Sequence, residues 1–302
     1  MKRSSLISKI LILFLVALIW GFGFVAQQVA ADSNFSSFVV VCFRGLLGSL
    51  CCLPFIFKEK PWKDLKFVFG SLFAGFVTFL GYLCSFYGQM LTSVSSAAFF
   101  VSFEIVFVPF LSFVFYKTKL LPKSIIGAII GIIGLFVFTY KPGEIEIFSV
   151  GNLVNLATAF FFAIQICQVS KLSTENKPFS LAFGQSIVVF ILGLLFIPFT
   201  GGFGNFSGSF IGIGAIAYLG IFATFITLML QNYGQKNIDP AIVSVILSTE
   251  TVFGTFFGII IYKDALTIQT VVGIVILFIA ILICTLDLKK IFKSKKKENI
   301  ER

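Results

Sequence analysis

The chain has 302 residues, of which 58% are hydrophobic and only 12% are Asp, Glu, Lys or Arg. A soluble domain carries about 25% charged residues, so this composition excludes a water-soluble globular protein and indicates that lipid surrounds most of the chain. The formal net charge of +10 does not indicate nucleic-acid binding, because the Lys and Arg residues lie in short loops and at the two ends of the sequence.

The predicted elements are ten apolar segments separated by short polar breaks. A span of about 20 residues crosses the hydrocarbon core, where every backbone polar group needs an internal partner, so we expect each segment to be a transmembrane helix. The first segment is longer than the apolar region of a signal peptide, which has about 7 to 15 residues, and we interpret it as an uncleaved helix. The predicted spans are residues 10–30, 36–57, 67–90, 94–116, 122–140, 147–169, 179–200, 210–233, 240–262 and 266–287.

The distribution of basic residues predicts the orientation of these spans. If the N-terminus is cytoplasmic and ten helices cross, only Lys141 and Lys263 of the 23 Lys and Arg residues fall on the outer side, and Arg44 falls within a span. This asymmetry is what the positive-inside rule describes. We therefore expect a multi-pass protein of the cell membrane, plasma or inner, with both termini in the cytoplasm. The basic tail is either a solvated stop signal or a segment that binds anionic lipid.

An internal repeat divides the chain into two units. A shift of 146 residues places the third to fifth spans on the eighth to tenth without a gap, so that Tyr87-Gly88-Gln89 aligns with Tyr233-Gly234-Gln235, and Glu104 with Glu250. A weaker match, shifted by 140 residues, aligns the first span with the sixth. Each unit has an odd number of helices, so the second enters the membrane from the opposite side. We predict an all-α integral membrane fold of about ten helices in two inverted five-helix repeats, the architecture of many secondary transporters. The predicted division is 1–143 for the first repeat, 144–287 for the second and 288–302 for the tail.

Four sequence stretches resemble a known family. They are Leu18-Ile19-Trp20-Gly21-Phe22-Gly23-Phe24, Phe43-Arg44-Gly45, Ser93 to Phe103, and Ile246-Leu247-Ser248-Thr249-Glu250-Thr251-Val252-Phe253-Gly254. With these motifs nearly the whole chain resembles the EamA-type transporters of the drug/metabolite transporter superfamily. Thr251 stands where the family often has Pro, and Lys117-Thr118 replaces a Gly followed by an acidic residue.

The resemblance implies a secondary transporter, not an enzyme, that moves small organic metabolites such as amino acids across the plasma membrane and works as an exporter. The inverted repeat adds alternating access, because two similar halves of opposite orientation give two states of similar energy. The alternatives are a flippase for lipids or lipid-linked groups, and a membrane protein without transport activity in which duplication only produced a stable bundle.

Three charged side chains lie well inside predicted spans, away from the span ends, where they are costly and mark functional sites by default. Glu104 and Glu250 lie near the middle of the fourth and ninth spans, and Arg44 lies in the second span toward its outer side. Three interpretations remain open. Arg44 forms a structural ion pair with one Glu; or the cluster binds a substrate, for instance a zwitterion with its carboxylate at Arg44 and its ammonium at a Glu; or a Glu without a partner exchanges protons and couples transport to them.

Uncharged polar side chains inside the spans are further candidates. Trp20 lies in the middle of the first span and either lines a cavity or packs. Gln27, Gln165 and Gln168 lie on the first and sixth spans, where amides either bond between helices or line a cavity. The predicted substrate-binding or coupling residues are thus Trp20, Gln27, Arg44, Glu104, Gln165, Gln168 and Glu250. Weaker candidates are Tyr82, Tyr87, Gln89, Tyr233 and Gln235.

The sequence predicts no cofactor and no metal site. Its six cysteines lie in apolar segments without a C-x-x-C pair, it has no histidine, and it has no G-x-x-x-x-G-K-[ST] motif for ATP. The expected partners are therefore a small-molecule substrate and the lipid bilayer. Gly127-x-x-x-Gly131, Gly208-x-x-x-Gly212 and Gly254-x-x-x-Gly258 are typical of close helix contacts, within the bundle or in a homodimer.

Overall fold

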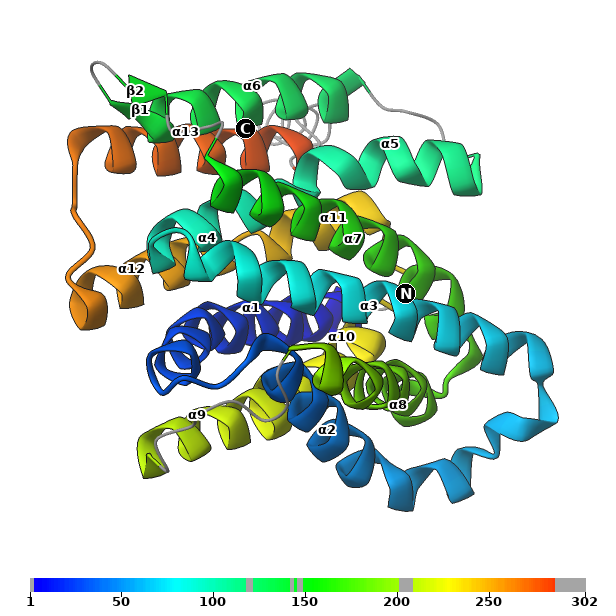
Figure 1. The fold of residues 1–302 in the computed structure, drawn as a ribbon. Coiled ribbons are helices and arrows are strands. Elements are labelled where there is room, and N and C mark those ends of the chain that lie inside the picture. Colours follow the sequence, from blue (N-terminus) through cyan, green and yellow to red (C-terminus); the bar gives the residue numbers. More distant parts are fainter. Residues whose placement is uncertain (1–2, 118–121, 142–143, 146–148, 201–208, 286–302) are drawn as a thin grey trace, which may run out of the picture.

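The computed structural model describes residues 3–117, 122–141, 144–145, 149–200 and 209–285 of the chain, which form one bundle of helices (Figure 1). The first half contains α1 (Arg3–Asp32), α2 (Ser37–Glu59), α3 (Leu65–Met90), α4 (Val94–Val101), α5 (Glu104–Tyr116) and α6 (Pro122–Thr139). The second half contains α7 (Val150–Leu172), α8 (Pro178–Phe196), α9 (Phe210–Gly220), α10 (Thr227–Gly234), α11 (Pro240–Leu247), α12 (Glu250–Tyr262) and α13 (Ile268–Thr285). A short antiparallel pair, β1 (Tyr140–Lys141) and β2 (Glu144–Ile145), lies between the halves. The predicted end of the first repeat at residue 143 and the tail 288–302 lie outside the described residues.

The predicted count of about ten membrane helices is confirmed. Within the described residues, eight helical segments are long and apolar enough to cross a membrane, and two shorter apolar helices, Ile125–Phe138 and Ile268–Ala280, complete the set. Large apolar side chains such as Phe69, Phe113 and Phe256 are exposed on the outside of the bundle, as a lipid-facing surface requires. All-α architecture follows, because each span satisfies its own backbone hydrogen bonds.

Two spans that the sequence predicted as continuous, 94–116 and 240–262, are each interrupted between two helices. At the first break Phe103 N bonds Phe100 O and Val106 N bonds Phe103 O, which are bonds over three residues in place of four. The second break repeats this pattern 146 residues later, and the Ser248 hydroxyl donates to the Ser102 carbonyl across the two breaks at 3.3 Å. The three helices that surround each break, α4 to α6 and α11 to α13, have bounds related by the same shift.

The two halves interlock along most of their length. The closest pairings, α2 with α8, α6 with α13 and α3 with α7, each join one half to the other. Glycines permit the α2–α8 contact: a Cβ on Gly45 would lie 2.2 Å from Phe190 N, and a Cβ on Gly193 would lie 2.7 Å from Cys42 Cα. Gly254 likewise faces Ala98 of α4, so this glycine pattern serves contacts inside the bundle. The homodimer stays a prediction.

The bundle has two chemically different ends. Helices alternate in direction, so the start of α1 and the ends of α2, α7 and α10 lie together at the end where N is marked in Figure 1. We call this the basic end, because it carries Lys9, Lys58, Lys60, Lys63, Lys66, Lys171, Lys177 and Lys236. The opposite end, with the turns at 33–36, 91–93 and 263–267, is called the far end.

Candidate functional site

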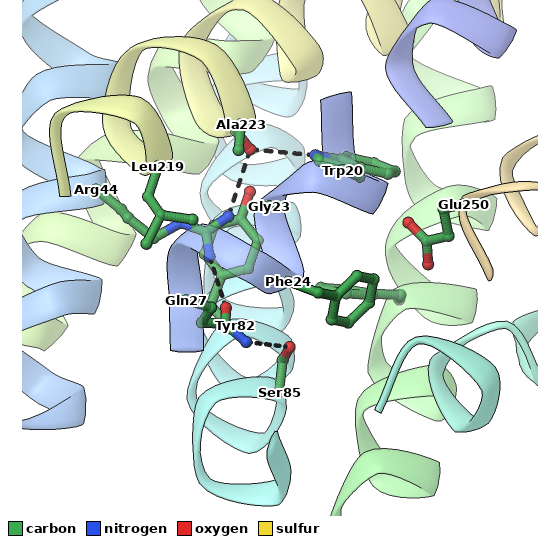
Figure 2. A pocket seen from close by; sticks show the side chains of 11 residues that line it. Trp20, Gly23, Phe24, Gln27, Arg44, Tyr82, Ser85, Leu219, Ala223 and Glu250 are labelled. Carbon is green, nitrogen blue, oxygen red and sulfur yellow. Dashed lines mark hydrogen bonds between the residues drawn. The ribbon is translucent and has the colours of Figure 1, made fainter. Parts of the chain in front are cut away.

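A pocket of about 370 Å³ of empty space lies between helices of both halves. Figure 2 shows polar and aromatic side chains converging on it from α1, α2, α3 and α12. A π-helical turn, Ile221–Ile226 between α9 and α10, closes one side. The lining residues are Trp20, Gly23, Phe24, Gln27, Arg44, Tyr82, Ser85, Phe162, Leu219, Ala223 and Glu250.

The Arg44 guanidinium is the charged centre of the pocket. It is 5% exposed and donates from Nε to Thr224 Oγ1 at 3.1 Å, from one terminal nitrogen to Gln27 Oε1 at 3.2 Å, and from the other to Ala223 O at 3.4 Å. Its Cζ lies 3.7 Å from the centre of the Tyr82 ring, where the ring face attracts a cation. None of these partners is a carboxylate, so among the described residues neutral dipoles hold the Arg44 charge, and the ion pair left open by the sequence is not formed.

The π-helical turn supplies two of these partners. In such a turn the backbone bonds span five residues, which leaves carbonyls free to accept other donors. Ala223 O accepts from both Arg44 and the indole Nε1 of Trp20, the latter at 3.1 Å. The Thr224 hydroxyl accepts from Arg44 and donates to Leu219 O, five residues back, at 2.7 Å. The predicted span 210–233 is confirmed as one membrane segment, Phe210–Gly234, and the π-helical turn lies inside it where it meets Arg44.

A chain of amides continues from Arg44 toward the far end. Gln27 accepts from Arg44 and donates to Ser85 Oγ at 3.1 Å and to Gln89 Oε1 at 2.9 Å. Gln89 in turn donates to Phe24 O at 2.5 Å. These bonds fix the Gln27 carbonyl toward Arg44 and join α1, α2 and α3 on this side of the pocket.

Aromatic rings form the opposite, apolar part of the lining. The rings of Trp20 and Phe162 stack with centroids 6.5 Å apart, and Phe162 meets the edge of Tyr82 at 5.8 Å. The Trp20 indole also donates to Thr227 Oγ1 at 2.9 Å. The pocket therefore combines a cationic, amide-rich wall with an aromatic, apolar wall.

Two glutamates lie beside the helix breaks. Glu250, the first residue of α12, is 4% exposed and lines the pocket on the side away from Arg44 (Figure 2). Glu104, the first residue of α5, is 2% exposed, and its Oε1 has no hydrogen-bond partner among the described residues. Glu104 lies within electrostatic range of Glu250, so the two carboxyl groups form a buried acidic pair where the two breaks meet.

The seven residues singled out from the sequence are divided by the fold. Trp20, Gln27, Arg44 and Glu250 meet in the pocket, whereas Glu104 is not among its lining residues but lies within electrostatic range of Glu250. Gln165 instead exchanges two amide hydrogen bonds with Gln231, at 3.1 and 3.2 Å. Gln168 donates to Gly70 O at 3.4 Å and lines a separate pocket with Phe73, Phe115, Ile164, Cys167 and Lys171.

Several lining residues carried no strong signal in the sequence. Tyr82 was a weaker candidate, and Ser85, Phe162 and Ala223 were not selected; nor was Thr224, which bonds Arg44 from outside the lining. Ser and Thr are common in membrane helices, and Phe accounts for 42 residues of this chain, so their types alone do not distinguish them. The one available signal was position: Ser85 lies one turn before Gln89 inside the repeated segment.

Comparison with known proteins gives a consistent result. The EamA-like transporter family matches the chain twice, over residues 7–140 and 149–286. An uncharacterized transporter of Archaeoglobus fulgidus is 32% identical over 274 residues, which is 91% of this chain and 84% of the relative. A second uncharacterized transporter of that organism is 26% identical over 267 residues, 88% of this chain and 94% of the relative. A crystal structure of a protein with 16% sequence identity superposes with a TM-score of 0.72 over 94% of this chain and 98% of that chain, and so shares its fold.

Proposed function

Because the chain belongs to the EamA-like transporter family, we propose that it carries small organic metabolites through the pocket between its two repeats by alternating access. Its membership makes it a membrane transporter and not an enzyme. The repeats 1–143 and 144–287 are the two units that move relative to each other in this proposal. Export is the proposed direction, from the basic end, which faces the cytoplasm, to the far end.

The buried Arg44 charge is the observation that carries the proposal. Its partners are neutral, so the guanidinium is hydrogen-bonded but its charge is not neutralised. A carboxylate or a similar anion on the solute would supply the negative charge that neutralises the guanidinium. Glu250 lies on the other side of the same pocket and suits an ammonium group, and the rings of Trp20 and Phe162 accept an apolar side chain. We therefore propose zwitterionic solutes of amino-acid type as the substrate class.

Counterflow in proteoliposomes tests this substrate class. Purified protein is reconstituted and screened for exchange of labelled amino acids, their amide and ester derivatives, uncharged metabolites and a fluorescent lipid. The proposal expects exchange of zwitterions, a large loss in Arg44→Lys, which keeps the charge but loses the planar fork, and a larger loss in Arg44→Gln. Tyr87→Phe is the control, because Tyr87 is 40% exposed on the outside of α3. Lipid movement without solute exchange supports the flippase instead, and full activity in Arg44→Gln contradicts the proposed site.

Proton coupling through Glu104 and Glu250 is a second proposal on the same site. Two carboxylates share a buried position, Arg44 is bonded elsewhere, and Glu104 Oε1 lacks a partner within the described part of the chain. Two negative charges buried within electrostatic range of each other repel in a medium of low dielectric constant, so a shared proton relieves the pair. If the pair exchanges its proton first on one side of the membrane and then on the other, the movement of protons is coupled to that of the solute.

Transport driven by a pH gradient tests this coupling. We expect Glu104→Gln and Glu250→Gln each to abolish the stimulation by a pH gradient, while solute exchange at equal pH continues in Glu104→Gln, because Glu104 does not line the pocket. Gln keeps the size of Glu and removes its titration. If both variants retain full gradient-driven transport, coupling by this pair is excluded, whereas loss of exchange as well as of stimulation assigns the glutamate to solute binding.

A further inference from the structure

A repeated polar stripe runs from the pocket toward each end of the bundle. On α3 it consists of Thr78, Ser85 and Gln89, and shifting these positions by 146 residues gives Thr224, Gln231 and Gln235. The spacing of seven and four residues keeps the α3 set on one helical face. The second set begins in the π-helical turn with Thr224, continues with Gln231 of α10 and ends at Gln235, the residue after α10. Because α3 and α10 run in opposite directions, the stripe on α3 leads to the far end and the stripe on α10 leads to the basic end (Figure 1).

Each stripe bonds a glutamine on the first helix of one half, although these two glutamines are not aligned by the shift of 140 residues. Ser85 accepts from Gln27 of α1, the first helix of its half, and Gln231 exchanges amide bonds with Gln165 of α7, the first helix of the other half. The second stripe begins beside Arg44, since Thr224 accepts directly from its Nε, and the α3 stripe reaches the pocket at Ser85. The polar surface therefore extends from the candidate site in two directions, by the same residues of each repeat.

The stripes differ in whether they are open. On the far side, Gln27 and Ser85 line the pocket, and a further hollow of about 1210 Å³ of empty space lies among the helix ends there, lined in part by Thr92, Ser95 and Asp264. On the basic side, neither Gln165 nor Gln231 lines the central pocket. Beyond these two residues, contacts between α1 and the end of α10 close the route to the basic end. Lys9 Nζ donates to Lys236 O at 2.5 Å, and Gly234 packs against Leu13.

Gln235 is the residue that this closure leaves unsatisfied. Its side chain is 0% exposed, and neither its amide nitrogen nor its amide oxygen has a hydrogen-bond partner within the described residues. Its repeat counterpart, Gln89, is also buried but makes amide bonds with Gln27 and with Phe24 O. A buried amide without partners is costly, and it is retained where another state supplies water or ligand to it.

We propose that Gln231 and Gln235 line the inner leg of the transport path, and that the reciprocal amide pair Gln165–Gln231 is its gate. Ser85 and Gln89 are the corresponding positions of the outer leg. The described arrangement is then the state that is shut toward the basic end. Breaking the amide pair hydrates Gln235 and connects the Arg44 pocket to the basic end. This inference rests on the proposed alternating access, and it specifies which side chains form the two legs.

Cysteine labelling in oriented membranes tests the path without a known substrate. Gln235→Cys and Gln89→Cys are treated, in inside-out and right-side-out vesicles, with a charged methanethiosulfonate reagent that does not cross membranes. The added mass is compared with that of the unaltered protein, whose own cysteines give the blank. Tyr233→Cys and Tyr87→Cys are matched controls, because these repeat-related residues lie two positions before Gln235 and Gln89 but are 51% and 40% exposed.

We expect Gln235→Cys to be labelled only from the basic end and Gln89→Cys only from the far end, with both tyrosine positions unlabelled from either side. In Gln165→Ala, labelling of Gln235→Cys accelerates about threefold to tenfold, the population shift expected for the loss of one or two buried hydrogen bonds. A combined variant that fails to insert is replaced by Gln165→Leu, which removes the same bonds and preserves side-chain volume.

The outcomes separate this inference from the proposed function. If Gln235→Cys is not labelled in a protein that exchanges solute, the proposed path is wrong, but the proposed transport function is unaffected. The expected labelling pattern in a protein that exchanges no solute supports the path and contradicts the proposed substrates. Labelling of Tyr233→Cys as fast as Gln235→Cys, or an unchanged rate in both Gln165 variants, overturns the assignment of the stripe or of the gate, respectively.

Discussion

Replacing Thr224 with Val tests whether the π-helical turn positions Arg44 for solute binding. Val has nearly the shape of Thr but lacks the hydroxyl that accepts from Arg44 Nε at 3.1 Å and donates to Leu219 O at 2.7 Å. A hydrogen bond to a charged group contributes about 1.5 to 3 kcal/mol when it is buried. Without it the guanidinium keeps two weaker hydrogen bonds, at 3.2 and 3.4 Å, and its contact with the Tyr82 ring.

The expected effect is on solute affinity. A solute that binds Thr224→Val must restore the Arg44 orientation, so its half-saturation concentration rises by roughly 12-fold to 160-fold, the range that corresponds to a loss of about 1.5 to 3 kcal/mol. The maximal exchange rate changes little, because Thr224 itself does not line the pocket. Initial rates of counterflow over a range of solute concentrations separate these two quantities.

Thr255→Val is the matched control. Thr255 is 2% exposed, and its hydroxyl has no hydrogen-bond partner among the described residues, so the same substitution removes no bond there. We expect its half-saturation concentration to stay within about twofold of the unaltered protein. If Thr224→Val does the same while its unfolding temperature falls, the hydroxyl stabilises the turn only, and the reasoning that links this turn to solute affinity is refuted.

Two further substitutions test the packing and the aromatic wall. Gly45→Ala places a Cβ 2.2 Å from Phe190 N and should destabilise the α2–α8 contact by about 1 to 3 kcal/mol, measured as a lower unfolding temperature in detergent. Gly214→Ala is the control, because a Cβ there has no atom within 4 Å and should leave the unfolding temperature unchanged. Equal stability of the two variants would contradict the close contact. Trp20→Phe loses the indole donor to Ala223 O, so it should lower the stability by about 1 kcal/mol and slow solute exchange. Unchanged exchange kinetics would show that Trp20 is not part of the site.

The apolar pattern determined the number, positions and directions of the helices, because lipid requires each span to be long, apolar and internally bonded. The breaks before Glu104 and Glu250 were not predicted, since neither break contains Pro or Gly. The repeat did mark both glutamates as equivalent, and the structure places each at the first position of a half-helix.

The partners of the buried polar residues could not be read from the sequence. Gln165 and Gln168 differ by three positions on one helix, yet one bonds Gln231 and the other faces Gly70. Which of them faces the bundle axis depends on the rotation of α7 against its neighbours, and the weak match between the first and sixth spans does not fix that rotation. The π-helical turn is a similar case, because it shifts the register of Thr227 relative to Leu219 by one residue without any distinctive residue type.

The two charges of the pocket, more than its aromatic rings, should decide which solutes are accepted. Arg44 and Glu250 lie on different sides of Phe24 and Trp20 in Figure 2, and each is almost fully buried. A solute that carries one charge leaves the other buried charge unmatched, and an uncharged isostere leaves both unmatched. Sites built to bond a polar group reject analogues that lack it by about 10⁴-fold, whereas an apolar wall separates neighbouring side chains by only about 10-fold to 200-fold. Selection between a zwitterion and its ester should therefore be strict, and selection among zwitterions with different apolar side chains should be broad.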